Sequence, residues 1–369
     1  MTNHPNLIAN PEILFDQVKE GAVTGLKYTS GTTEVYGPDQ WRFSSAQLAT
    51  ATFELYQEAT SLLGSECCLT AKTKTAKVSA VHDDFDHIEH AIEGWYLRGL
   101  KLGTANAAPL MLSFTAEASI AGTYSCAIME GHANSQSCTK TYTLAAANTP
   151  QRFNLSFPAN TSAIWHTKGG FGMKVMWDLG SGADFIAPAN DVWQPAAFWK
   201  GAGTISLTQN ANATLKITEV DVYPGTVARP FYYEPYEQQL FKLQRYFYKT
   251  FPQGTPVGTG KGIHGTLTYI GALAGAAGFG GAQLQPPANG TIFTSDAMPQ
   301  TSDPSLITYN PQNANANWYN LSRGADSGVA LGYRPCERGV FIQNAPVVAD
   351  RASDTYIIHA TLNRRLGRF

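Results

Sequence analysis

Short runs in which apolar and polar residues alternate make up most of the chain before residue 224. Apolar side chains alternate with their neighbours at Met173, Val175 and Trp177 within Gly172–Trp177, and at Leu215 and Ile217 within Thr214–Val220. A period of two is typical of a strand with one buried face. About ten such runs, at roughly ten-residue spacing and separated by Gly, Asn, Asp and Pro, predict a β-sandwich or barrel. Leu26–Thr29 and His87–Tyr96 are two further predicted strands.

The segment 231–251, FYYEPYEQQLFKLQRYFYKTF, breaks this pattern and predicts a helix. Tyr236, Leu240, Leu243 and Phe247 are spaced at i, i+4, i+7 and i+11, which gives a helix one apolar face. Pro235 suits a first helical turn, where its missing N–H is not needed. A single aromatic helix between two β-rich regions indicates a domain junction over residues 231–254.

The segments on either side of this junction complete the predicted organisation. Residues 1–24 are predicted to form an open, polar attachment arm. A sandwich domain is predicted over 25–230, and a smaller β domain over 255–369. The strands predicted in the smaller domain are Gly265–Ile270, Ser305–Tyr309, Gly339–Ile342 and Tyr356–Leu362.

Composition and charge narrow the function classes. The net charge is −2, and no Lys/Arg block occurs apart from Arg364–Arg365, so we expect no nucleic-acid partner. No stretch approaches the roughly 20 apolar residues of a membrane span, and we expect no membrane insertion. The first residues lack the pattern of a signal peptide. Five cysteines, an odd number that includes the vicinal pair Cys67–Cys68, argue against a disulfide framework and favour synthesis in a reducing cytosol.

Two longer stretches and one short motif are specific enough to carry a resemblance. They are Ile92–Tyr96 with Leu100–Thr104 and Pro109–Phe114; Val220–Thr226 with Pro230–Phe231 and the helix at 237–246; and the early run Tyr36–Phe43. Together they resemble a family of bacteriophage virion proteins, often described as tail-fibre or structural proteins. This chain departs from the family at Gln40, where Arg is usual, and at Leu243, where Cys is frequent. The resemblance covers residues 5–251; residues 255–369 match only in length and closing strand.

The resemblance implies an all-β fold: a jelly-roll β-sandwich similar to carbohydrate-binding modules, one short α-helix and a smaller C-terminal β domain. It also implies a virion appendage, assembled in the host cytoplasm, that binds host surface polysaccharide and contacts other virion proteins through the arm at 1–24. We expect a homo-oligomer, with a trimer as the favoured form, because many copies on one particle multiply weak contacts and oligomers cover sheet edges. The alternative is a purely structural virion part, such as a head decoration, collar or baseplate connector.

Aromatic residues between 165 and 199 are the candidate glycan contacts. Sugar binding uses flat aromatic faces flanked by amides and carboxylates. Trp177 lies on an alternating strand and is predicted to be core, whereas Trp193 and Trp199 lie in a Pro- and Gly-flanked segment that favours exposure. Trp95 and Tyr96 would fall on opposite faces of a strand, one in the core and the other free to be exposed. The predicted glycan-binding residues are Trp165, Asn190, Asp191, Trp193, Gln194 and Trp199.

The densest polar cluster, between His82 and His90, is the candidate metal site. Asp83, Asp84 and Asp86 supply carboxylates that could hold a structural Ca²⁺. An EF-hand pattern is absent, and the favoured interpretation is a solvated turn that leads into a half-exposed strand. On that strand His87 and Glu89 would share one face and His90 the other. We therefore expect no cofactor, with Ca²⁺ as the open alternative.

No motif indicates an enzyme. Glu93 is interpreted as a buried structural carboxylate, because glycoside hydrolysis needs a second carboxylate about 5–9.5 Å away. A depolymerase would require such a pair, and the sequence does not identify one. The Gly/Lys run at 254–261 fails the spacing of a phosphate-binding loop. Gly-x-Ser-x-Gly, Cys-x-x-Cys and His-Glu-x-x-His motifs do not occur.

Overall fold

A computed structural model of the chain divides into two compact units. Unit 1 comprises Met1–Asp16 and Gly21–Gln239, and unit 2 comprises Gln17–Glu20 and Leu240–Phe369. The residues that the structure describes are 5–21, 33–45, 51–131, 133–134, 136–258, 264–270, 281–284, 305–313, 315–336, 339–344 and 354–363. The predicted strand at 26–29 lies outside these residues. Within them, no helix has the length and apolar character needed to cross a membrane.

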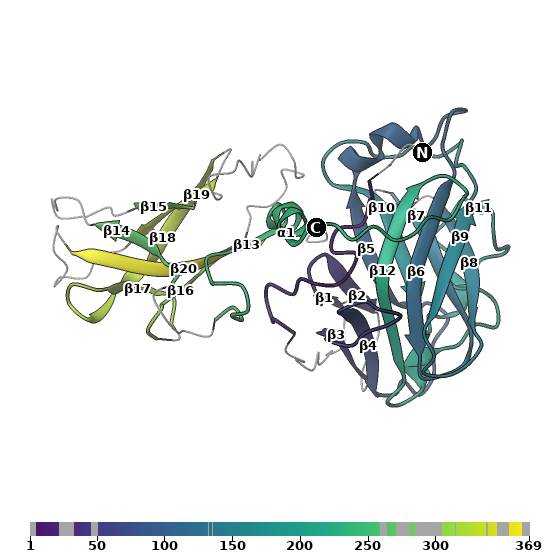
Figure 1. Cartoon of the computed structure of the whole chain (residues 1–369), viewed down its shortest axis with the longest axis horizontal. Helices are drawn as coiled ribbons and strands as arrows, with labels where there is room; N and C mark the ends of the chain where they lie inside the picture. The colour runs from purple at the N-terminus through teal and green to yellow at the C-terminus, as the bar shows by residue number, and fades with distance from the viewer. Residues whose placement is uncertain are drawn as a thin grey trace. The chain divides into compact units, whose positions relative to one another are not determined.

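Unit 1 is a sandwich of two antiparallel sheets, and the prediction of an all-β fold is confirmed (Figure 1). The seven-stranded sheet has the order β1-β2-β5-β10-β7-β8-β11, with bounds Thr33–Tyr36, Trp41–Ser45, Asp86–Glu93, Phe171–Asp178, Gly122–Glu130, Ser137–Leu144 and Trp193–Gln194. The five-stranded sheet has the order β3-β4-β12-β6-β9, with bounds Thr52–Glu58, Cys68–Thr75, Thr214–Pro224, Leu110–Ala118 and Gln151–Phe157.

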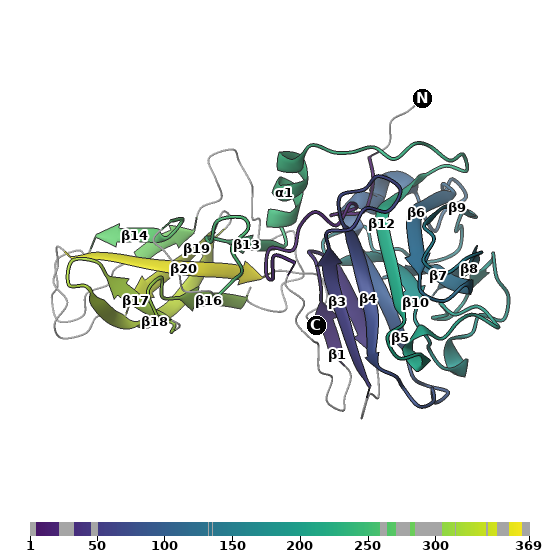
Figure 2. The ribbon, with the colours of Figure 1, turned by 60° about the horizontal axis from the view of Figure 1, so that its bottom comes forward.

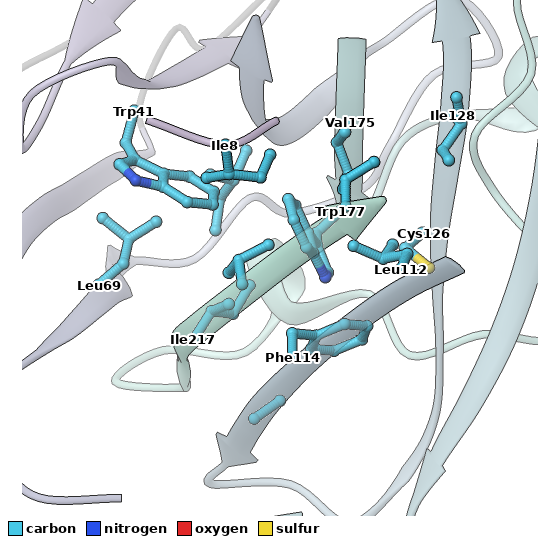
Figure 3. Close-up of a cluster of buried hydrophobic side chains, with 14 of the residues drawn as sticks. Ile8, Trp41, Leu69, Leu112, Phe114, Cys126, Ile128, Val175, Trp177 and Ile217 are labelled. Atoms are coloured by element: carbon cyan, nitrogen blue, oxygen red, sulfur yellow. The ribbon is translucent and has the colours of Figure 1, made fainter. Parts of the chain in front are cut away.

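The core lies between the two sheets and is rich in aromatic side chains (Figure 3). Trp177, on β10, is fully buried, as its alternating strand predicts. Its ring centroid lies 5.6 Å from that of Trp41 and 5.5 Å from that of Phe114, which come from opposite sheets. Edge-to-face and tilted ring pairs of this kind add to the free energy gained from burial alone. Period-two alternation therefore identified the inward face of this strand correctly.

The segment 5–16 is not open, so the prediction of an open arm over 1–24 is wrong for these residues. Ile8 and Ile13 are buried in the core of the sandwich. Asn10 and Glu12 are buried as well, and their side-chain hydrogen bonds are satisfied inside the fold. Asn10, for example, donates from Nδ2 to the carbonyl oxygens of Phe15 (2.8 Å) and Asp39 (3.1 Å).

This segment connects the two sheets. On the five-stranded sheet, the N–H of Leu7 donates to the carbonyl of Val222, and the N–H of Val220 donates to the carbonyl of Pro11, each at 3.0 Å. On the seven-stranded sheet, the indole N–H of Trp41 donates to the carbonyl of Asn10 at 3.1 Å. His90 donates from Nε2 to the carbonyl of Ala9 at 2.9 Å. The segment is therefore an integral part of the sandwich.

The helix α1, Tyr236–Gln244, is shorter than the predicted segment. Phe247, expected on the helix face, begins the strand β13, Phe247–Lys249, which pairs with β20. The backbone groups of these residues gain inter-strand partners, which the helix pattern could not anticipate. Leu243 is buried as predicted, whereas Tyr236 is 46% exposed. The boundary between the two units falls within α1.

Unit 2 is built around the long strand β20, Thr355–Asn363 (Figure 2). Its sheet has the order β13-β20-β17-β18-β19-β15, with β14 and β16 also paired with β20. The bounds are β14 Leu267–Ile270, β15 Gly281–Leu284, β16 Ser305–Tyr309, β17 Asn317–Asn320, β18 Ala325–Cys336 and β19 Gly339–Asn344. All four strands predicted in this region are present. Trp318 and Ile358 are fully buried in this unit.

Candidate functional site

The strand β5 ends at Glu93 and is followed by the short 3₁₀ helix η1, Gly94–Leu100. In a 3₁₀ helix, residues three apart share a face. Leu97 and Leu100 face the core and are buried, whereas Trp95 is 40% exposed and Tyr96 is 47% exposed. The expectation that one of this aromatic pair would be core is therefore wrong. The strand on which that expectation depended ends at Glu93, two residues before Trp95.

The exposed face of η1 combines aromatic and cationic groups. The guanidinium carbon of Arg98 lies 5.4 Å from the centroid of the Trp95 ring, one 3₁₀ turn away. This distance is within the range of a cation–π interaction. Lys101, which follows the helix in the left-handed conformation (φ 52°), is also exposed. The result is a flat apolar surface with fixed positive charge beside it.

The loop 158–170 packs directly against η1. The N–H of Gly94 donates to the carbonyl of Gly170 at 3.0 Å, and the N–H of Gly103 donates to the carbonyl of Asn160 at 2.8 Å. A Cβ at position 94 would lie 2.4 Å from the carbonyl oxygen of Lys168, so only glycine fits there. Six exposed side chains of these two adjacent segments define a surface that we call the η1 rim: Trp95, Tyr96, Arg98, Lys101, Ile164 and Lys168.

Two of the predicted glycan residues, Trp165 and Trp193, come together next to the rim. Their ring centroids lie 5.7 Å apart in an edge-to-face arrangement. Trp165 is only 7% exposed, and Trp193, on β11, is half-buried. The indole N–H of Trp193 donates to the carbonyl of Pro158 at 2.8 Å, at the start of the loop 158–170. Trp165 thus supports the loop from beneath, and Trp193 fixes the position where it begins.

Trp199 lies elsewhere, and its expected exposure is wrong. It is 5% exposed and stacks on Phe185 with a centroid distance of 4.2 Å. Its indole N–H donates to the Ser181 hydroxyl at 2.8 Å. With Met129 and Met176 it forms a second, smaller apolar cluster. The segment that carries it folds back against the seven-stranded sheet instead of remaining a surface loop.

The predicted polar contacts lie on the segment around β11. Asn190 and Asp191 are exposed, and Gln194 is half-buried. Asp191 forms an ion pair with Lys140. The Gln194 amide donates to the carbonyl of Ala189 at 3.4 Å. Asn190 and Asp191 thus stand close in sequence to Trp193, although Asp191 already has a cationic partner.

Two of the three predicted Ca²⁺ residues, Asp84 and Asp86, form ion pairs with a lysine. The ammonium of Lys77 lies 3.0 Å from an oxygen of Asp84 and 2.9 Å from an oxygen of Asp86, while Asp83 is exposed. Burial is the main cause that raises the pKa of Asp86. Among the residues that the structure describes, no group of three His, Cys, Asp or Glu side chains is arranged to hold a metal ion.

The strand that follows this turn is buried along its whole length, so its expected half-exposure is wrong. The expected faces are present: Nε2 of His87 lies 3.2 Å from Oε2 of Glu89, and His90 points to the other side. Burial lowers the pKa of His90 to about 4. Glu93 is buried, as expected. These groups are part of the packed sandwich and not of the η1 rim.

No family model matches the sequence, and no curated protein matches it. Several solved structures are similar in part. The enzymatically active domain of tailspike protein 4 of bacteriophage CBA120 has a TM-score of 0.29 and 10% identity, covering 50% of this chain and 19% of that one. The family 11 carbohydrate-binding module of a Clostridium thermocellum cellulase has a TM-score of 0.27 and 7% identity, covering 55% and 100%. TmCBM61, solved with β-1,4-galactotriose, has a TM-score of 0.27 and 8% identity, covering 60% and 99%.

This chain therefore spans about a fifth of the length of the tailspike domain that it matches. All three TM-scores are low.

Proposed function

We propose that unit 1 is a non-covalent glycan-binding module, and that the chain is a phage virion protein, a tail fibre or spike that uses it to attach to host surface polysaccharide. The observation that carries this proposal is the pair of adjacent exposed aromatic side chains, Trp95 and Tyr96, on a short helix at one end of the sandwich. Exposed, flat and rigid rings suit the apolar faces of sugar rings and lose little conformational entropy on binding.

The surroundings of the pair suit the same role. Trp193 and Asn190 lie on the segment that anchors the loop 158–170, which itself packs against η1. Exposed amides and hydroxyls on these segments match the hydroxyl groups of a sugar. In this proposal the module binds without catalysis and without a cofactor, and the lysine at Asp84 and Asp86 satisfies the charge of those carboxylates.

The virion part of the proposal comes from the sequence resemblance at 92–114 and 220–231. A single sugar contact is weak, and identical subunits on one particle would raise the effective concentration of sites. We propose a homo-oligomer, in trimeric form, assembled in the host cytoplasm into the virion. Because residues 5–16 are packed into the sandwich, contacts with other virion proteins would use other surfaces of the chain.

The test is binding of the fluorescently labelled full-length chain to intact host cells, alone and with free host polysaccharide as competitor. Trp95→Ala and Tyr96→Ala should weaken saturable binding while circular dichroism stays unchanged. The matched control is Tyr232→Ala, which removes a ring that is 63% exposed outside the η1 rim. Equal binding by all three variants, or no competition by polysaccharide, would contradict the proposal.

A second candidate is a structural virion part, such as a head decoration, collar or baseplate connector. The burial of Trp199 and the internal hydrogen bond of Trp193 favour it, because both reduce the aromatic surface left for sugars. The exposed rings of Tyr232, Tyr233 and Tyr236 could then serve as assembly contacts. This role predicts that Tyr232→Ala lowers incorporation into particles, measured by quantitative immunoblotting of purified virions, while the η1 rim variants incorporate normally.

A further inference from the structure

We infer that the polysaccharide bound by the η1 rim is anionic and carries carboxylate or phosphate groups. This inference rests on the proposed glycan-binding function and adds the chemical class of the ligand. It follows from the charge of the rim, from the position of Arg98, and from the pairing or burial of the nearby carboxylates.

The two segments that form the rim contain only basic ionisable side chains apart from tyrosine. Residues 94–109 and 158–170 include Arg98, Lys101, His166 and Lys168, and neither segment contains an Asp or Glu. Arg98, Lys101 and Lys168 are exposed. The chain as a whole has 28 acidic and 26 basic residues, so this local excess of positive charge is not a general property of the surface. A cluster of one sign raises the local concentration of oppositely charged ligand.

The carboxylates of adjoining segments do not neutralise this charge. Glu93, directly before η1, is 1% exposed. Glu130, at the end of β7, is fully buried, and its Oε2 accepts the N–H of Ala133 at 2.8 Å. Asp191, two residues before Trp193, is ion-paired with Lys140. The positive groups of the rim therefore face solvent without an acidic neighbour from these segments.

Arg98 is placed where one sugar unit could meet both a ring and a cation. Its guanidinium lies 5.4 Å from the Trp95 centroid. Arginine stacks on aromatic rings and binds carboxylate or phosphate through two parallel hydrogen bonds. A charged sugar residue stacked on Trp95 or Tyr96 would bring its acidic group within reach of this fork. A neutral sugar would leave the cationic groups without a counterpart.

The test measures binding of the full-length chain to four soluble polymers: a polyuronate, a phosphate-bearing polyol polymer, a neutral β-glucan and polyglutamate. The expected result is salt-sensitive binding to at least one of the first two, and weak binding to the neutral glucan. Arg98→Gln should weaken it about tenfold, the scale of one charge-assisted pair. Lys74→Gln, which removes an exposed cation on β4 that is ion-paired with Glu54, is the control and should change polymer binding little.

The outcomes separate this inference from the proposed function. One result would overturn the inference and leave glycan binding intact. In it, the chain binds the neutral glucan as tightly as the anionic polymers, this binding depends on Trp95, and Arg98→Gln does not change it. Binding to polyglutamate as tight as to either anionic polysaccharide, and insensitive to Trp95→Ala, would show that charge alone acts and would overturn the inference. Failure to bind any polysaccharide would overturn both. Comparing the polyuronate with the phosphate polymer identifies the acidic group.

Discussion

Arg229 and Asp221 form a bidentate ion pair that holds the chain segment after β12 against that strand. Nε of Arg229 lies 2.9 Å from Oδ2 of Asp221, and one terminal nitrogen lies 2.9 Å from Oδ1. The guanidinium also sits 3.9 Å from the Tyr223 ring centroid. Asp221 belongs to the stretch Val220–Thr226 that carries the family resemblance, and Arg229 directly precedes Pro230. The function of the ion pair in this molecule is architectural: it turns the chain out of the sandwich toward α1.

Replacing Arg229 by Lys should therefore destabilise unit 1 by about 1–3 kcal/mol, because lysine cannot supply the planar fork and Asp221 is buried. Urea denaturation followed by tryptophan fluorescence would measure the loss. Arg98→Lys is the control, since Arg98 is exposed and should leave the unfolding midpoint unchanged. An equal effect of both substitutions would refute the role given to the ion pair.

Loss of a ring from the aromatic core should lower the free energy of unfolding more than loss of the Arg229 ion pair. Trp177→Ala would open a cavity between Trp41 and Phe114 and should cost about 3–5 kcal/mol. Trp95→Ala removes a side chain of the same type that is 40% exposed, and should change the free energy of unfolding by less than about 0.5 kcal/mol. Thermal unfolding of the two variants side by side distinguishes core from surface tryptophan. Similar losses would contradict the exposure described for η1.

Gly94 and Gly99 provide a matched pair on η1. A Cβ at position 94 would lie 2.4 Å from the Lys168 carbonyl oxygen and 2.5 Å from that of His166, and neither backbone atom can move independently. At position 99 nothing lies within 4 Å. Gly94→Ala should displace the loop 158–170, with loss of stability and of glycan binding, whereas Gly99→Ala should be neutral. Hydrogen exchange of the loop amides would report the displacement directly, and unchanged exchange in Gly94→Ala would count against it.

The buried carboxyl group of Glu12 should make the free energy of unfolding depend on pH. Burial raises its pKa from 4.5 to about 7, and its Oε1 accepts a 2.6 Å hydrogen bond from the Gln239 amide. Because the folded-state pKa lies above the unfolded value, the native protein binds the proton more tightly. This contribution to stability is present below about pH 4.5 and is lost as pH rises through 7.

Glu12→Gln should remove this dependence. The stability of the variant relative to the unsubstituted chain should rise between pH 4.5 and 7 and level off above pH 7. Chemical denaturation at a series of pH values would measure the difference. His90 acts in the opposite direction: its pKa is lowered to about 4, so its contribution is lost as pH falls from 6.5 through 4. A difference between the two proteins that does not change with pH would contradict the assignment to Glu12.

The sequence pattern predicted those elements whose burial depends on neighbouring residues in the same strand. Alternation identified the inward face of β10, and the four strands predicted in the C-terminal β domain are present in unit 2. The η1 rim was missed because the strand stops before Gly94. Position 94 must be glycine because the backbone of Lys168, 74 positions later, leaves no room for a Cβ. The only sequence signal was the Gly after Glu93 in a run that otherwise resembles a strand.

Two segments were predicted to be exposed, but residues distant in the sequence pack against them or bond to them. The first segment was predicted to be an open, polar arm, yet the Asn10 amide donates to backbone carbonyls in the interior. Trp199 looked accessible because of flanking Pro and Gly, yet its segment packs on Phe185 and bonds Ser181. Both errors have one cause: tertiary hydrogen bonds and packing decide the burial of residues that lie outside regular elements.

The segment at 5–16 has a consequence for how the protein is made. The Asn6 side chain donates to the carbonyl of Val220 at 2.8 Å and accepts the N–H of Val222 at 3.0 Å, across 214 and 216 positions of the sequence. At about 5–20 residues per second, the ribosome adds β12 roughly 10 to 40 s after Asn6. During this interval Ile8 and Ile13 lack the strand that helps to cover them. Contacts so distant in sequence slow folding, and the sandwich would close only near the end of its own synthesis.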